Sequence, residues 1–181
     1  MNILLHTCCG PCSIYPVRVL RDEGFQVTGY FHRNNIHPFT ECRKREETLE
    51  TYAKDIDLRL IIQKGYDLEQ FLQNMAFRES QRCLICYNER LMATALLAKH
   101  GHFDGFSTTL LYSRYQNHVA LKSTGESVSE KTGVPFIYRD FREGWQEGID
   151  ESRKREMYRQ PYCGCIYSEK KRYYKKSRDV S

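Results

Sequence analysis

The chain has 181 residues and a formal net charge of +5, because 28 Lys and Arg residues outnumber 23 Asp and Glu residues. This length fits a single domain spanning residues 1–181, and the 13% aromatic content argues against disorder. No apolar run approaches the ~20 residues that a membrane span needs, and the N-terminus lacks the basic start of a secretion signal. We therefore expect a cytoplasmic protein with no membrane partner, whose positive charge favours a polyanionic partner.

Apolar periodicity predicts strands and helices in alternation along the chain. Strands are predicted at residues 2–6, 25–31, 58–62, 103–107 and 134–138. Helices are predicted at residues 12–23, 38–54, 66–75, 81–99 and 116–132. The alternation indicates an α/β fold, in which a mostly parallel sheet of about five strands is flanked by helices, as in Rossmann-like proteins.

Residues 148–181 are strongly charged, and we expect them to form a C-terminal extension of the domain. The extension contains a Cys-Gly-Cys sequence and a basic tail, since residues 169–178 hold six basic residues and one acid. Residues 170–176 combine basic side chains with two tyrosines, which suits contact with RNA phosphates and unpaired bases. Residues 43–45 (Arg-Lys-Arg) form a second basic cluster. A solvated surface is the alternative interpretation of both segments.

Eight cysteines in a chain expected in the reducing cytosol indicate metal or redox chemistry and not a disulfide framework. Seven of them form three groups, which are Cys8, Cys9 and Cys12, then Cys83 and Cys86, then Cys163 and Cys165. The first group follows the first strand, and ligands of open α/β sheets bind at the carboxyl ends of strands. The remaining cysteine, Cys42, is expected to be a small buried side chain.

The cysteine pattern alone leaves three chemistries open. Four thiolates suit either a tetrahedral zinc ion or an iron–sulfur cluster. The sequence from Cys9 to Cys12, Cys-Gly-Pro-Cys, also matches a thioredoxin-like redox site. ATP chemistry is not indicated, because the loop after the first strand lacks a glycine-rich phosphate cradle and Pro11 removes an amide donor.

Four motifs, taken together, resemble one known family. They are residues 6–12 (HTCCGPC), 83–86 (CLIC), 138–142 (YRDFR) and 162–165 (YCGC). In this order and spacing they resemble the QueH-type epoxyqueuosine reductases over nearly the whole chain. The resemblance implies the nucleotide alpha-hydrolase-like form of the Rossmann-like fold. It also implies a cobalamin-independent conversion of epoxyqueuosine to queuosine in the tRNA anticodon, with a [4Fe-4S] cluster and a second, mononuclear iron.

The resemblance further implies a division of labour among the cysteines. The cluster ligands would be Cys8, Cys9, Cys83 and Cys86, and the redox-active pair would be Cys163 and Cys165. Such a dithiol can give two electrons by closing a disulfide, which matches the two-electron removal of an epoxide oxygen. Neither the role of Cys12 nor the physiological electron donor follows from the sequence.

The motif at residues 138–142 supplies the remaining candidate site residues. Asp140 is expected to be catalytic, as a ligand of a second iron or as a proton carrier, with a helix N-cap or an ion pair to Arg142 as the alternative. Tyr138, Arg139 and Arg142 are expected to contact the substrate.

Two functions of other classes stay open beside the reductase. A zinc-stabilised RNA-binding protein would use the cysteines for structure alone. A thiol–disulfide oxidoreductase would use Cys9 and Cys12 directly. The reductase, unlike these, requires both a tRNA partner and a source of electrons.

Overall fold

The computed structural model describes residues 1–174 and contains a four-stranded sheet in the order β3–β2–β1–β4, with every pairing parallel. The strands are β1 (Asn2–Thr7), β2 (Gln26–Phe31), β3 (Arg59–Ile62) and β4 (Gly105–Thr108). The predicted parallel α/β architecture is therefore confirmed. Lys175 and Lys176 of the predicted basic tail lie outside the described residues.

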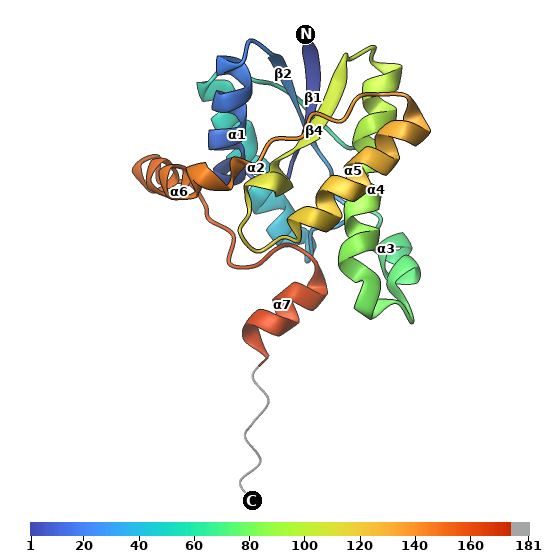
Figure 1. Cartoon of the computed structure of the whole chain (residues 1–181). Coiled ribbons are helices and arrows are strands. Elements are labelled where there is room, and N and C mark those ends of the chain that lie inside the picture. The colour runs from blue at the N-terminus through green and yellow to red at the C-terminus, as the bar shows by residue number, and fades with distance from the viewer. Residues whose placement is uncertain (175–181) are drawn as a thin grey trace, which may run out of the picture.

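Helices cover both faces of the sheet (Figure 1). They are α1 (Gly10–Asp22), α2 (Phe39–Asp55), α3 (Leu68–Met75), α4 (Arg82–His100), α5 (His118–Thr132), α6 (Trp145–Lys154) and α7 (Ile166–Tyr173). α1 and α2 lie on one side of the sheet, and α4 and α5 pack together on the other side. None of these helices combines the length and apolarity that crossing a bilayer requires.

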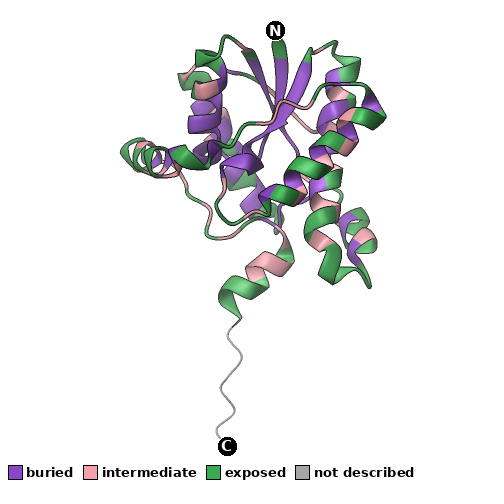
Figure 2. Ribbon diagram, in the orientation of Figure 1, coloured by how far each residue is buried: buried purple, intermediate pink, exposed green. Residues whose placement is uncertain are grey.

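The central strand β1 joins the two halves of the core. Ile3 and Leu5 pack with Val17 of α1, whereas Leu4 packs with Leu91 of α4. Successive side chains of a strand point to opposite faces, so this apolar run fills both sides at once. β1, β2 and β4 are accordingly buried along almost their whole length, whereas the edge strand β3 is only partly covered (Figure 2).

The carboxyl end of β1 places the first cysteine group at the edge of the sheet. Cys8 and Cys9 form the link between β1 and α1, and Cys9 is the N-cap residue of α1, with its Sγ accepting the N–H of Cys12 at 3.4 Å. Pro11 sits in the first turn, where its missing N–H would have no helical partner. The Cys8 N–H donates to the Thr109 hydroxyl at 3.2 Å, which ties this link to the segment that follows β4.

The strand predicted at residues 134–138 is reduced to a single bridge. Phe136 pairs with Phe106 of β4, where the Phe106 N–H donates to the Pro135 carbonyl at 2.9 Å and the Ile137 N–H donates to the Phe106 carbonyl at 2.8 Å. Pro135 has no N–H, so it cannot continue the ladder as a donor. The sheet therefore has four strands where about five were predicted.

The C-terminal part contains two helices that periodicity did not predict. α6 packs against α1, and α7 lies apart from the sheet at the opposite end from the N-terminus (Figure 1). α6 buries only Gly148 and Ser152, and α7 buries no residue. Such polar helices lack the apolar stripe on which a sequence-based prediction depends.

Substitution of a glycine in α5 tests how residues 134–138 pack against this helix. A Cβ at Gly125 would overlap the ring of Phe136. We expect Gly125→Ala to lower the free energy of unfolding by about 1–3 kcal/mol through overpacking, although alanine favours helix formation. Ser123→Ala, at an exposed position of the same helix, is the control and should leave stability nearly unchanged. Equal stability of both variants in urea unfolding would contradict this packing.

Candidate metal centre and active site

Cys8, Cys9 and Cys12 form a buried triad of thiols at the carboxyl edge of the sheet. Their sulfur atoms all lie within 4.8 Å of one another, and the Sγ atoms of Cys8 and Cys9 are 3.8 Å apart. A tetrahedral ion with metal–sulfur bonds of about 2.3 Å has ligand atoms about 3.8 Å apart. The separation of these two sulfurs therefore fits two ligands of one thiophilic metal ion.

The environment of the triad favours ionisation of one thiol. Hydrogen bonds from the Cys12 and Cys9 thiols hold the pKa of Cys8 well below its usual range. Burial instead raises the pKa of Cys9. The side chain of Gln160 donates to the sulfurs of Cys9 at 2.9 Å and Cys12 at 3.1 Å, so the segment before α7 covers the triad. Donors that converge on sulfur stabilise thiolate charge, which is the form that binds metals.

A second group of four cysteines surrounds a neighbouring pocket. The pocket is lined by Asn35, Phe71, Arg82, Cys83, Cys86, Tyr87, Arg90, Leu110, Gln116, Cys163 and Cys165. Cys83 and Cys86 come from the first turns of α4, whereas Cys163 and Cys165 come from the segment that precedes α7. Cys163 Sγ accepts a hydrogen bond from the Gln116 side chain at 3.2 Å. The residue is exposed at the surface, but the protein around the thiol displaces water from it and raises its pKa to about 11. Two segments distant in sequence thus bring four sulfurs around one cavity.

Arg90 connects the two cysteine groups. Its guanidinium is buried, with 2% of the residue exposed, and donates to Cys86 Sγ at 3.2 Å, to His6 Nε2 at 3.1 Å and to the Asn35 carbonyl at 3.0 Å. Burial and the adjacent Arg90 charge lower the pKa of His6 well below its usual value, so His6 is neutral and its Nδ1–H faces the Thr108 hydroxyl.

The charge of Arg90 shows that the donor set suits a thiolate-bound metal group. Among residues 1–174 this guanidinium has no carboxylate within ion-pair distance, and an uncompensated buried charge costs several kcal/mol. The groups near it that can carry negative charge are the sulfurs of Cys86, Cys8 and Cys163, whose charge would raise the pKa of Arg90. Anionic sulfur at this place therefore neutralises a cation that the fold has already buried.

Arg45 holds the Cys163–Cys165 segment in place. Only 1% of this residue is exposed, and its guanidinium donates to the carbonyls of Cys163 at 3.0 Å and Tyr162 at 2.9 Å and pairs with Glu41 at 2.7 Å. The Tyr158 hydroxyl donates to the other oxygen of Glu41. The expectation that residues 43–45 form a basic RNA-binding cluster is thus wrong for Arg45, whose guanidinium is buried and paired with Glu41.

The residues of the 138–142 motif lie at a different place from the cysteine pocket. Asp140 caps the short helix at Phe141–Gly144 by accepting the Arg142 N–H at 3.1 Å, and its carboxylate also pairs with the Arg142 guanidinium. This hydrogen-bonded ion pair lowers the pKa of Asp140 to about 2. Arg139 pairs with Glu23 at 2.9 Å, and Lys122 Nζ lies over the Tyr138 ring at 5.1 Å.

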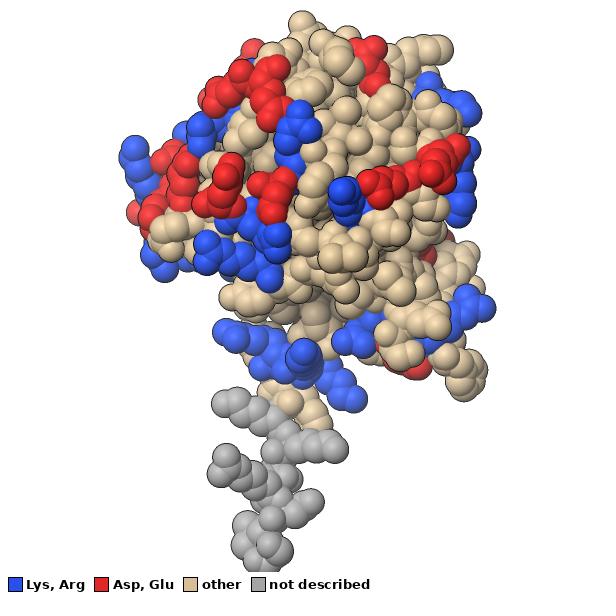
Figure 3. Space-filling view, viewed as in Figure 1, with Lys and Arg blue, Asp and Glu red and all other residues tan. Residues whose placement is uncertain are grey.

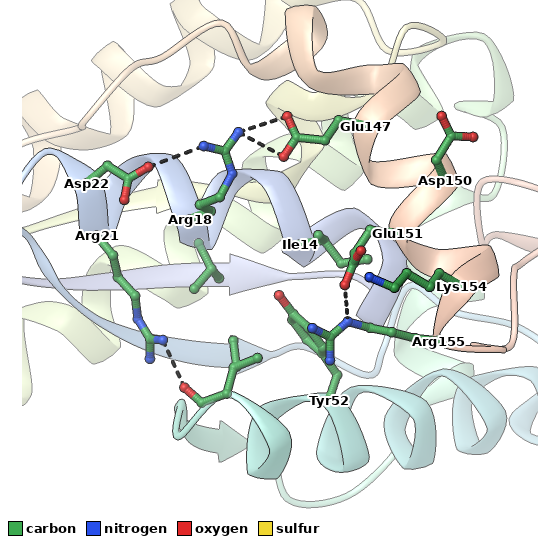
Figure 4. A pocket seen from close by; sticks show the side chains of 12 residues that line it. Ile14, Arg18, Arg21, Asp22, Tyr52, Glu147, Asp150, Glu151, Lys154 and Arg155 are labelled. Atoms are coloured by element: carbon green, nitrogen blue, oxygen red, sulfur yellow. Dashed lines mark hydrogen bonds and ion pairs between the residues drawn. The ribbon is translucent and has the colours of Figure 1, made fainter.

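A third cavity, of about 660 Å³, lies between α1, α2 and α6 and contains no cysteine (Figure 4). Most of its charged side chains form ion pairs with one another. Arg18 pairs with Asp22 and Glu147, and Arg155 pairs with Glu151. Because most of these charges are already paired, the cavity offers few unmatched groups to a ligand.

Comparison with known proteins assigns the chain to a protein family. A family model described as "Epoxyqueuosine reductase QueH" matches residues 3–171. The chain belongs to this family. A QueH-named relative from Dehalococcoides mccartyi is 34% identical over 172 residues, covering 95% of this chain and 94% of the relative. Another, from Thermotoga maritima, is 33% identical and covers 92% of this chain and 90% of the relative.

A solved structure with the same fold lies outside the QueH family. The crystal structure described as a predicted subunit of tRNA methyltransferase, from Methanocaldococcus jannaschii, matches with a TM-score of 0.58 and 12% identity. The match covers 84% of this chain and 74% of the other chain. At this identity the likeness concerns the fold alone.

The structure groups the QueH motif cysteines differently from the division that the sequence implied. Cys8 and Cys9 lie with Cys12, to which the family resemblance assigned no role, whereas Cys83 and Cys86 lie with the Cys163–Cys165 pair. The signal for Cys12 was its spacing from Cys9, which sequence reasoning interpreted as a redox motif. Sequence reasoning also missed Arg90 and Gln160, because nothing in the spacing of a polar residue reveals that it contacts sulfur in the fold.

The Arg45 contacts generate a stability prediction. Arg45→Met would leave Glu41 buried without its cation, and we expect unfolding to become easier by about 3–5 kcal/mol. Arg43→Met on the same helix is the control, because Arg43 is exposed and, among residues 1–174, its ion-pair partner is the exposed Glu47. Urea unfolding monitored by circular dichroism measures both variants. Loss of stability in both, or in neither, would show that Arg45 does not anchor the segment.

Proposed function

We propose that this protein reduces epoxyqueuosine in the anticodon of a tRNA to queuosine, by a route that does not use cobalamin. Membership of the QueH family supports the substrate and the reaction. The observation that carries the proposal is the meeting of Cys83 and Cys86 with Cys163 and Cys165 around one pocket, beside the triad of Cys8, Cys9 and Cys12. A reduction needs electron-donating groups close to the reacting base, and these thiols can act as such groups.

The reaction balances with a dithiol as the immediate source of electrons. Removing the epoxide oxygen to leave an alkene takes two electrons and two protons and releases one water molecule. When two thiols close a disulfide, they give up two electrons and two protons. In the proposal Cys163 and Cys165 supply them, and an external donor, which the cell must provide, reduces the pair again. Arg45 fixes the carbonyl of Cys163 and so positions this pair.

The proposed cofactor is a [4Fe-4S] cluster, accompanied by a mononuclear iron. We assign the cluster to Cys8, Cys9, Cys83 and Cys86. In support, Arg90 binds Cys86 Sγ directly and reaches the Cys8 side of the site through His6. Cys8, Cys9, Cys83 and Cys86 would hold the cluster, and Cys8 Sγ and Cys9 Sγ, which are now 3.8 Å apart, would adjust their positions to do so. When bound, a cluster passes electrons singly, at a potential that nearby charges and hydrogen bonds set.

Contact with tRNA is proposed for the basic face beside the pocket. Exposed Lys170, Lys171 and Arg172 of α7 gather there (Figure 3). Phosphate binding by such side chains makes affinity fall with salt. Asp140, Tyr138, Arg139 and Arg142 stay proposed catalytic and substrate-binding residues on the strength of the family motif, and tRNA is large enough to reach both places.

The structure disfavours a thiol–disulfide oxidoreductase that uses Cys9 and Cys12. Both sulfurs are buried, with 1% and 9% of the residues exposed. Burial raises the pKa of Cys9, and hydrogen bonds with the Cys8 and Cys9 thiols raise that of Cys12. A thiol that attacks protein disulfides needs the opposite, an accessible sulfur with a depressed pKa.

Substitution of single cysteines tests the proposed roles. Cys83→Ala should lose most of the iron and the visible absorption, because three thiolates hold a cluster poorly. Cys163→Ser should keep the absorption and lose at least a hundredfold in conversion of epoxyqueuosine to queuosine, measured by mass spectrometry of digested tRNA under anaerobic conditions. The hundredfold is an estimate on the order of the loss that follows removal of a reacting group.

Cys42→Ala is the matched control for both variants. Cys42 packs among Phe31, Ile36 and Leu49 and is not one of the residues that line the cysteine pocket. It should retain both absorption and conversion. If Cys163→Ser loses the absorption instead, this cysteine is a metal ligand and the proposed division of roles is incorrect.

A further inference from the structure

The segment between α3 and α4 exposes an aromatic side chain in an unfavourable backbone conformation. Phe77 has 99% of its surface exposed and a φ angle of +60°. A bulky residue without a local hydrogen-bonding side chain rarely adopts this left-handed conformation. Leu72 and Leu84 on the flanking helices are exposed as well. Backbone strain at an exposed aromatic residue is an observation from which a hypothesis of function can be drawn.

This tip is followed directly in the chain by residues of the cysteine pocket. The chain runs from Phe77 through the short helix Glu79–Gln81 directly into α4, whose first residues Arg82 and Cys83 line the pocket. Arg82 also lies over the ring of Tyr167 in α7, with its guanidinium carbon 5.9 Å from the ring centre. The tip, the pocket mouth and α7 are therefore parts of one surface.

The charge of that surface favours an anionic partner. Arg78 and Arg82 from the tip join Lys170, Lys171 and Arg172 from α7, and Figure 3 shows basic side chains gathered at this end of the molecule. Glu79 and Glu169 are the acids in the same two short segments, so basic groups outnumber acidic ones. An exposed aromatic ring beside several cations is the combination with which proteins bind unpaired nucleotides.

We propose that Phe77 stacks on an unpaired base of the RNA loop, adjacent to the nucleotide that enters the cysteine pocket. The inference rests on the proposed function, since it takes the RNA to be the substrate of that pocket. Arg78 and Arg82 bind the loop's phosphates, while the ring supplies a contact that a fully paired helix cannot offer. The modified base must leave the stack of its neighbours to reach the pocket, and Phe77 takes the place of one lost neighbour.

Binding of an anticodon stem-loop to the anaerobically purified full-length protein tests this contact. Phe77→Ala should weaken the affinity about thirtyfold, the middle of the range for one stacked base. Phe77→Trp should restore it. Binding of a fully paired duplex of equal length should be the same for all variants. The salt dependence of stem-loop binding should not change, because no phosphate contact is removed.

A fluorescent base gives a readout that a purely structural role would not move. A 2-aminopurine in the loop should be quenched by the native protein and by Phe77→Trp, and should stay bright with Phe77→Ala. Val119→Ala is the matched control, because Val119 is an exposed apolar residue on α5, 81% exposed, and it should behave as the native protein. Equal affinity and equal quenching with Phe77→Ala would overturn the inference.

Two further outcomes distinguish failure of the stacking inference from failure of the proposed function. If the native protein binds the stem-loop through Phe77 but converts no epoxyqueuosine, the proposed function fails and the stacking contact stands. If sedimentation shows that Phe77→Ala abolishes self-association while RNA binding is unchanged, the tip is a protein–protein contact and the inference fails.

Discussion

A buried guanidinium without a carboxylate partner is the constraint around which the site is built. Arg90 lies beneath the cysteine pocket, and within the described chain its hydrogen bonds go to a sulfur, a neutral imidazole and a carbonyl. A positive charge in such a place is tolerated only where negative charge is close. The sulfurs of Cys86 and Cys8 are the available anions, and metal-bound thiolates would keep them anionic at neutral pH. A thiolate-bound cluster would therefore supply the negative charge that the buried Arg90 guanidinium requires.

The fold brings distant segments to this charge by two different means. Regular structure places the end of β1 beside the end of β4 and the start of α4, so that Cys8 and Cys86 are positioned by the sheet and its covering helix. The segment before α7 has no strand to hold it. Polar side chains do so instead, with Arg45 binding the carbonyl of Cys163 and Gln160 contacting the triad. A redox pair on such a segment can change its bonding without disturbing the core.

Sequence reasoning predicted those features that depend on local periodicity. The apolar runs at β1 and β2 and the long pattern of α4 are strong, and the structure confirms these elements near their predicted bounds. The predicted fifth strand failed because the run around Phe136 looks like a strand, although Pro135 prevents it from pairing along its length. α7 was missed because a helix that buries nothing has no apolar period.

The candidate site divides in the same way. The cysteines were identified because their residue type and close spacing are themselves the signal. Arg45 was assigned to the surface because a run of three basic residues looks solvent-exposed. Only the tertiary fold shows that Arg43 and Lys44 are exposed whereas Arg45 is buried. Arg90 gave no signal at all, since its importance lies in what it touches. Charges that become buried are thus the features that a single sequence conceals.

Iron and acid-labile sulfide content of the anaerobically purified native protein tests the central claim most directly. A thiolate-bound [4Fe-4S] cluster that neutralises Arg90 predicts a brown protein with about four irons and about four sulfides per chain, plus further iron if the mononuclear site is filled. A colourless protein with one zinc and no sulfide would contradict the account, because the buried charge would then be balanced by a structural metal site and the pocket would hold no electron carrier.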